Sequence, residues 1–103
     1  MLYKTEFGNY NVKVIRSTYR NNNRLAIRLM DRQDDAPVSV LTVNLVDEAI
    51  ESDNLAFVDT NNNPNILEFI KENALGEFTG RYGRSGYCTY PLYRFDLDKL
   101  EQM

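Results

Sequence analysis

The sequence contains no histidine and a single cysteine, Cys88. Without histidine, one chain cannot build a Ser-His or Cys-His catalytic pair or a histidine metal site. One cysteine can neither close an internal disulfide nor supply the thiolates of a zinc or iron–sulfur site. Histidine is also the commonest general acid or base near neutral pH. These absences argue against an enzyme, and we expect no catalytic residue, no metal and no cofactor.

Long apolar runs are missing as well. None approaches the roughly 20 residues that a membrane helix needs, and the N-terminal segment M-L-Y-K-T-E-F-G lacks the apolar core of a signal peptide. An unpaired cysteine suits a reducing compartment. We therefore expect a cytoplasmic protein without membrane contact. A chain of 103 residues that is 43% hydrophobic and 26% charged is expected to fold as one domain, residues 1–103.

The net charge of −3 conceals a segregation of charge along the chain. Residues 1–32 carry seven basic and two acidic residues, whereas residues 33–77 carry ten acidic residues and one basic residue. Residues 78–95 contain three arginines and no acid. This pattern indicates either a dipolar surface that selects its partner electrostatically or neighbouring strands that neutralise each other.

Alternating apolar residues predict a largely antiparallel sheet. The expected strands are Leu2–Phe7, Tyr10–Tyr19, Arg24–Asp31, Val38–Val46 and Tyr87–Phe95. Gly8-Asn9 and the asparagine-rich segment 20–24 are expected to form the first two turns. Val38–Val46 is apolar on both faces, as in a central strand. The residues 55–58 form either a strand or a packed loop.

One helix of roughly ten residues is expected after Asn63. Asn63 is a suitable N-cap and Pro64 a suitable first residue. Glu68 and Glu72 would face outward, and Gly76 would end the helix. The expected inward residues are Ile66, Phe69, Ile70 and Ala74. Helical turns are also expected in residues 47–54 and 96–103. The predicted fold is α+β: an antiparallel sheet of about five strands, formed by an N-terminal meander and a late C-terminal strand, with the helix packed on one face.

The segment 78–95 is the first candidate for a binding site, because it combines six aromatic residues with its three arginines. The glycines in residues 80–86 predict a loop. Pro91 lies within the predicted strand Tyr87–Phe95 and indicates that this strand is an edge strand or carries a bulge. The candidate partner-binding residues are Arg81, Tyr82, Arg84 and Tyr87. Tyrosine and arginine suit a protein interface, and equally suit phosphate contact and base stacking. The alternative is a surface loop whose tyrosines pack on the sheet.

Two further charged groups are candidates. Asp47, Glu48, Glu51 and Asp53 form a carboxylate cluster, which without a metal or a base is expected to be an acidic partner-binding patch. Arg24, Arg28 and Arg32 are expected to line the exposed face of one strand. Together with Arg81 and Arg84 they would form a nucleic-acid-binding surface. A solvated face is the alternative for this row.

Two other features are expected to be structural. Asp59 begins the segment D-T-N-N-N, which resembles a calcium loop, but Pro64 and Ile70 occupy the positions that require glycine and glutamate. Cys88 alternates within a predicted strand and is expected to be a small buried side chain rather than a nucleophile.

Several stretches carry a resemblance to a known family. They are Ala56-Phe-Val-Asp-Thr-Asn-Asn-Asn-Pro64, Thr79-Gly-Arg81, Ser85-Gly-Tyr-Cys-Thr-Tyr-Pro-Leu-Tyr-Arg-Phe-Asp96 and Val40-Leu-Thr-Val-Asn-Leu45. They resemble a family of small uncharacterised proteins carried by conjugative transposons, plasmids and phages of Gram-positive bacteria. The family has no assigned activity. The resemblance implies an accessory protein of a mobile element, a setting in which small acidic proteins often inhibit host defence nucleases.

Residues and resemblance together predict a non-enzymatic binding protein. Its expected partner is a host defence protein, a nuclease or CRISPR effector, which it inhibits in an anti-CRISPR or anti-restriction manner. The acidic patch and the Arg/Tyr segment would make the contact. The alternative is a small accessory protein that binds nucleic acid through the arginines.

Overall fold

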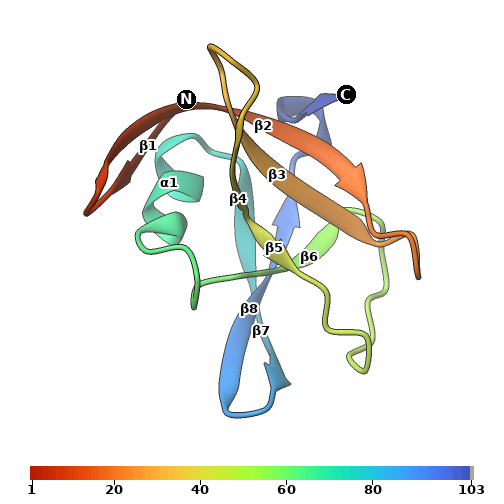
Figure 1. Ribbon diagram of the computed structural model, residues 1–103. Helices are drawn as coiled ribbons and strands as arrows, with labels where there is room; N and C mark the ends of the chain where they lie inside the picture. Colours follow the sequence, from red (N-terminus) through yellow and green to blue (C-terminus); the bar gives the residue numbers. More distant parts are fainter. Residues whose placement is uncertain (103) are drawn as a thin grey trace.

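The computed structural model describes residues 1–102 and folds into two sheets and one helix (Figure 1). The first sheet has the order β1 (Leu2–Thr5), β2 (Gly8–Thr18), β3 (Leu25–Asp31), β4 (Pro37–Val40), and β9 (Glu101–Gln102) pairs with β2. The second sheet has the order β5 (Thr42–Val43), β6 (Leu55–Val58), β8 (Cys88–Phe95), β7 (Gly76–Ser85). All strand pairs are antiparallel except β2–β9. The predicted α+β class, with a mostly antiparallel sheet of five strands and one helix, is confirmed.

The two sheets are joined at Leu41, between β4 and β5. The Leu41 N–H donates to the Ile27 carbonyl of the first sheet, while its own carbonyl accepts from Asp59 N–H beside β6. The buried hydroxyl of Thr42 accepts the Ile27 N–H at 3.1 Å. The prediction of one central strand over residues 38–46 is therefore wrong. Its apolar residues face two directions because the chain passes from one sheet into the other.

The second sheet carries a hydrophobic cluster on each face. Ala56 and Val58 of β6 belong to the larger cluster, which lies between the two sheets and includes the buried side of the helix. Leu55 and Phe57, which alternate with them, belong to a smaller cluster together with Leu45. Successive side chains of a strand point to opposite faces, so the four buried residues of β6 serve both clusters.

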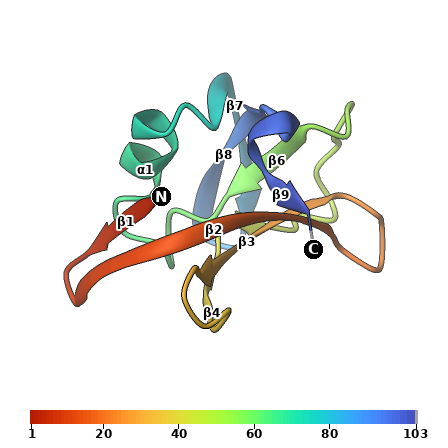
Figure 2. The same ribbon diagram turned by 90° about the horizontal axis from the view of Figure 1, so that it is seen from above.

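Helix α1 (Ile66–Glu72) lies between β1 and β7, as Figures 1 and 2 show. Its inward residues Ile66, Phe69 and Ile70 are buried as predicted. Its limits differ from the prediction. The helix has seven residues and ends at Glu72, and Ala74, with φ of 50°, is exposed rather than inward.

Asn63 is not the N-cap of α1. The residue before the helix is Asn65, which has a φ of 62° and makes no side-chain cap bond. Asn63 is buried, and its Nδ2 donates to the carbonyls of Val40 at 2.8 Å and Asp59 at 3.1 Å. The predicted capping role of Asn63 is therefore wrong, because its side chain bonds to two backbone carbonyls outside the helix.

The first hairpin turns at Glu6 and Phe7 rather than at Gly8 and Asn9. Thr5 pairs with Gly8, so Gly8 already belongs to β2. Thr5 Oγ1 accepts the Phe7 N–H at 3.2 Å and donates to the Gly8 carbonyl at 2.8 Å, which fixes the shorter turn. Phe7 is consequently placed in the turn, 86% exposed. The second predicted turn is confirmed, with Asn23 in the left-handed region.

The segment 80–86 is mostly strand, not loop, because β7 continues to Ser85. β8 is an inner strand between β6 and β7, so the edge alternative for Pro91 is wrong, and so is the expected place of this strand in the first sheet. The bulge alternative agrees with a register shift in the β7–β8 pairing. Pro91 is tolerated because the pairing of β8 with β6 begins at Leu92. On its other side Pro91 pairs with Tyr82, at a register shift that lies between Phe78 and Tyr82 of β7.

The remaining segments also differ from helical expectations. Residues 47–54 form an irregular loop with turns or bends near its two ends. The expected terminal helix is a single 3₁₀ turn, η1 (Leu97–Lys99), in which the Asp96 carboxylate accepts the Asp98 N–H, and β9 follows it. The expected helix also included Met103, which lies outside the described residues. No helix in residues 1–102 has the length and hydropathy to cross a bilayer.

Candidate binding surface on the β7–β8 hairpin

The guanidinium of Arg81 holds the loop between β5 and β6 against β7. Its Nη2 donates to the Ala49 carbonyl at 2.6 Å, and its Nη1 donates to Glu51 Oε1 at 3.0 Å. Glu48 Oε1 lies 3.6 Å from Nη2, and the guanidinium sits 5.9 Å from the centre of the Phe57 ring. The Arg81 side chain is only 35% exposed. Arg81 is therefore a structural anchor, which its position in a predicted loop did not indicate.

These contacts change the status of the carboxylate cluster. Glu48 faces Arg81 and also accepts the Arg84 N–H at 3.2 Å through its Oε2. It thus occupies a backbone donor on the outer edge of β7, a common way of protecting an edge strand from further pairing. Asp47 and Asp53 are exposed and form none of the ion pairs recorded for residues 1–102. The predicted acidic patch is therefore partly neutralised.

The tip of the hairpin presents the other predicted partner-binding side chains to solvent. Tyr82 is 59% exposed and Tyr87 is fully exposed, at the turn between β7 and β8. Arg84 is exposed and, unlike Arg81, takes part in none of the ion pairs recorded for the described chain. In Figure 1 the hairpin extends below the rest of the molecule. The structure thus brings Tyr82, Arg84 and Tyr87 together and assigns Arg81 to their support.

A row of aromatic rings connects this tip to the core. Tyr82 meets Phe78 edge to face at 5.1 Å between ring centres, Phe78 lies 5.8 Å from Tyr93, and Tyr93 lies 6.1 Å from the buried Phe95. Such pairs contribute about 0.5–1.5 kcal/mol each beyond their buried area. Burial, with a smaller contribution from Tyr82, raises the pKa of Tyr93 above its ordinary value. The row holds Tyr82 in place while leaving it accessible.

Sequence reasoning missed Phe78 and Tyr93 as parts of this surface. Phe78 is 43% exposed although it lies in a paired strand. Its pairing with Tyr93 on one face was detectable in principle from strand alternation. The prediction of a loop over residues 80–86 excluded that register, whereas β7 resumes its pairing with β8 at Tyr82 after a register shift.

Gly83 fixes the hairpin on the smaller cluster. A Cβ at this position would lie 2.5 Å from Phe57 Cε1 and 2.8 Å from Leu45 Cδ1. Gly83 is buried, so no side chain has room there. Close approach of the backbone, rather than loop flexibility, explains this glycine.

The predicted arginine row is not a continuous surface. Arg24 is half-buried and donates to the carbonyls of Leu45 at 2.8 Å and Glu48 at 2.7 Å. Arg32 pairs with Glu101 at 2.6 Å. Arg28 is exposed and has no partner among the recorded ion pairs of residues 1–102. Two of the three side chains are thus engaged within the chain, Arg24 by backbone carbonyls and Arg32 by an exposed ion pair.

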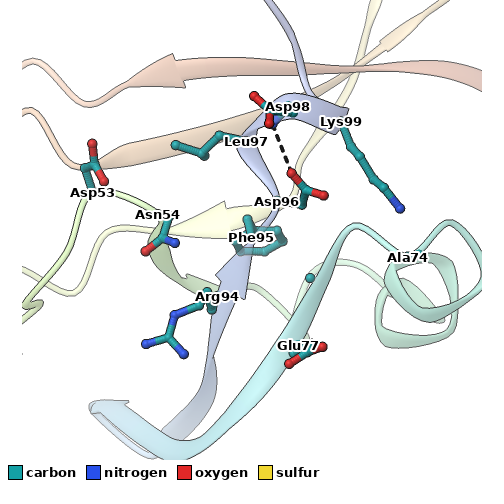
Figure 3. Close-up of a pocket in the computed structure, with 11 residues that line it drawn as sticks. Asp53, Asn54, Ala74, Glu77, Arg94, Phe95, Asp96, Leu97, Asp98 and Lys99 are labelled. Carbon is teal, nitrogen blue, oxygen red and sulfur yellow. Dashed lines mark hydrogen bonds between the residues drawn. The ribbon is translucent and has the colours of Figure 1, made fainter.

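A surface depression of about 700 Å³ lies elsewhere, near η1. Its charged lining residues are Asp53, Glu77, Arg94, Asp96, Asp98 and Lys99 (Figure 3). Figure 3 shows Asp53 and Glu77 at opposite sides of it, so the carboxylates do not converge on one point. Among the described residues no group of three or more potential ligands could hold a metal ion.

Asp59 and Cys88 have structural surroundings. The Asp59 carboxylate accepts from the backbone and side-chain amides of Asn62, at 3.1 and 2.9 Å, and therefore closes its own loop. Cys88 is half-buried, less than predicted, and packs against the smaller cluster.

One family model matches the chain, over residues 13–103, and it describes a domain of unknown function, DUF4313. A comparison with curated proteins found no match. A comparison with solved structures found none either.

Proposed function

The chain belongs to the family described as a domain of unknown function (DUF4313), and we propose that it is a non-enzymatic binding protein whose β7–β8 hairpin docks on a partner protein. The observation that carries the proposal is the exposure of Tyr82 and Tyr87 beside Arg84 on one protruding hairpin. Tyrosine and arginine are enriched among the residues that dominate protein interfaces. The sequence resemblance to mobile-element proteins makes a host defence nuclease the partner to test first.

Preorganisation supports this role. The aromatic row and the Arg81 contacts hold both strands of the hairpin before any partner arrives. Binding by a rigid hairpin loses less conformational entropy than binding by a flexible loop. A flexible cationic loop, as the sequence predicted, would have been a weaker anchor.

The acidic patch takes a smaller part in this proposal than in the sequence-based hypothesis. Glu48 and Glu51 face Arg81, so their charge is partly compensated within the chain. Asp47 and Asp53 remain exposed and are proposed to contribute long-range attraction to a basic partner rather than the main contact.

The proposal is tested by adding the purified chain to DNA cleavage assays with restriction and RNA-guided nucleases. The variant Tyr82→Ala/Arg84→Ala/Tyr87→Ala is compared with Leu2→Ala/Val40→Ala, which removes exposed apolar side chains from the first sheet. Each hot-spot residue contributes about 2 kcal/mol or more, so the hairpin variant should inhibit at least about 100-fold less strongly. The control variant should inhibit like the original chain.

Two results would contradict the proposal in different ways. Equal inhibition by the hairpin variant would remove the hairpin as the contact. Absence of inhibition by the folded original chain, over all nucleases tested, would remove the nuclease as the partner.

Nucleic-acid binding is the second candidate function, and one observation favours it. Arg84 lies between two exposed tyrosines on a segment without any acidic residue, a combination that suits stacking on bases and contact with phosphates. Its test is a titration of labelled single-stranded DNA and RNA at increasing salt. Affinity should fall steeply with salt if phosphates are bound, and Arg84→Ala should reduce that slope.

A further inference from the structure

A second groove lies on another part of the molecule, between the β1–β2 hairpin, β4 and the loop that precedes α1. Its volume is about 370 Å³, and its lining residues include Tyr3, Phe7, Tyr10, Val38 and Asn62. None of its lining residues belongs to the β7–β8 hairpin. The tip of the β1–β2 hairpin projects from the body at the left of Figure 2.

Aromatic rings form the walls of this groove. Tyr3 is buried at its base and is fixed there, because its hydroxyl donates to the Pro64 carbonyl at 2.7 Å and its ring lies 5.3 Å from Phe69. Phe7 is 86% exposed and Tyr10 is 36% exposed. The short turn at residues 6–7 thus places a phenylalanine in solvent beside an open groove. A phenylalanine in this position gains no burial within the chain.

The rim of the groove is acidic. Asp31 lines it, and the loop that follows carries the exposed Asp34. Both carboxylates accept backbone N–H groups of their own loop, from Gln33 and Ala36, and neither takes part in an ion pair recorded for residues 1–102. Of the nearby cations, Lys13 pairs with Asp35 and Arg32 with Glu101, so neither forms an ion pair with Asp31 or Asp34. A ligand of this groove therefore meets uncompensated negative charge.

The backbone near the groove also favours an extended ligand. β4 has only β3 as a neighbour in its sheet. Asn63 covers its far end by bonding to the Val40 carbonyl, while Pro37 and Val38 face the groove. A groove with aromatic walls suits the polyproline conformation, which needs no partner for backbone pairing and little ordering on binding.

We propose that this groove binds an extended, proline-rich segment of a partner protein that carries a basic residue, with the prolines against the exposed rings of Phe7 and Tyr10 and the basic residue at Asp31 and Asp34. This interaction is separate from the hairpin surface. A protein with both would contact two partners, or one partner at two places.

The test is an NMR titration of the ¹⁵N-labelled chain with three short synthetic peptides. One consists of proline and alanine with an arginine at one end, the second has glutamate in place of arginine, and the third has serine in place of every proline. The first peptide should shift the amide signals of Phe7, Tyr10, Val38 and Asn62. It should bind at least about tenfold more tightly than either of the others, a difference of about 1.4 kcal/mol.

Two variants test the aromatic part and the acidic part of the groove separately. Phe7→Ala/Tyr10→Ala should weaken binding of the arginine peptide at least about tenfold. It should not unfold the chain, because both side chains are exposed. Asp31→Asn/Asp34→Asn keeps the acceptor oxygens of the loop, and it should abolish the preference for arginine over glutamate. Tyr87→Ala, on the hairpin, is the matched control and should bind like the original chain.

Three outcomes would overturn the proposal. They are equal binding of all three peptides, shifts confined to the β7–β8 hairpin, and shifts of the groove signals that depend on protein concentration without any peptide. The last result would assign the groove to a second copy of the chain.

Discussion

Arg81 donates to both carboxylate oxygens of Glu51, at 3.0 and 3.4 Å. One residue belongs to the Arg/Tyr segment and the other to the carboxylate cluster. The sequence presents the Arg/Tyr segment and the carboxylate cluster as separate parts of a binding surface. In the structure they are linked through Arg81 and Glu51. An alanine substitution at Arg81, Glu48 or Glu51 therefore acts on both groups, so binding variants are better placed at other positions.

Arg81→Ala should destabilise the fold more than Glu51→Ala. The Arg81→Ala variant also loses the bond to the Ala49 carbonyl and the packing on Phe57. We therefore expect its free energy of unfolding to fall by about 1–2 kcal/mol. Urea unfolding of both single variants and the double variant gives the coupling energy. It should not exceed about 1 kcal/mol, because the Glu51 side chain is 67% exposed. Equal effects of the two single variants would contradict the anchoring role.

Gly83→Ala should destabilise the chain by about 1–3 kcal/mol, the usual cost of overpacking. The new methyl group would lie 2.5 Å from the Phe57 ring and 2.8 Å from Leu45. Phe57 and Leu45 are both packed in the smaller cluster. Thermal or urea unfolding measures the change. Ser85→Ala in the same strand is the control, since an exposed position should change stability by less than about 0.5 kcal/mol. Equal stability of the two variants would show that β7 does not approach Phe57.

Asn63→Ala should destabilise the chain by about 2–3 kcal/mol, more than the loss of a helix cap. The substitution leaves the carbonyls of Val40 and Asp59 without their donor in a buried site, and unsatisfied buried groups are costly. Asn65→Gly is the matched variant. It should be nearly neutral, because glycine adopts the φ of 62° easily. A loss of about 1 kcal/mol or less for Asn63→Ala would support the capping role instead.

Stability should decrease as the pH rises above about 10, the ordinary pKa of tyrosine. Burial raises the pKa of Tyr19 and of Tyr3 in the folded chain. The unfolded chain therefore loses these protons first, so the stability present below this pH is lost as the pH rises through the raised values. Urea unfolding at a series of alkaline pH values measures the slope. Tyr19→Phe should reduce it, and an unchanged slope in that variant would exclude Tyr19 as a contributor.

The candidate site was only partly predictable. Tyr82, Arg84 and Tyr87 are exposed, as a binding role requires. Their residue types alone had made them candidates. The contacts that hold the surrounding backbone in place could not be predicted from the sequence. Arg24 and Arg81 resemble surface cations in the sequence, yet each donates to backbone carbonyls far away in the chain.

The sequence by itself determined the local features that depend on neighbouring residues. Alternation in β3 placed Leu25, Ile27 and Leu29 in the core, because side chains of a strand alternate between its faces. The spacing of Ile66, Phe69 and Ile70 gave the buried side of α1 for the same geometrical reason. The asparagine-rich turn followed from the tolerance of asparagine for the left-handed region, which Asn23 adopts.

Only the tertiary structure decided how these elements combine. The segment 38–46 is apolar on both faces, and its composition fits one central strand as well as two strands in different sheets. The corner at Leu41 exists because Ile27 and Asp59 provide hydrogen-bond partners on either side of it. Gly83 likewise belongs to a strand because Phe57 and Leu45 approach its backbone. Contacts between residues far apart in the chain carry most of the free energy that selects among such local alternatives, and local propensities are too weak to make that selection.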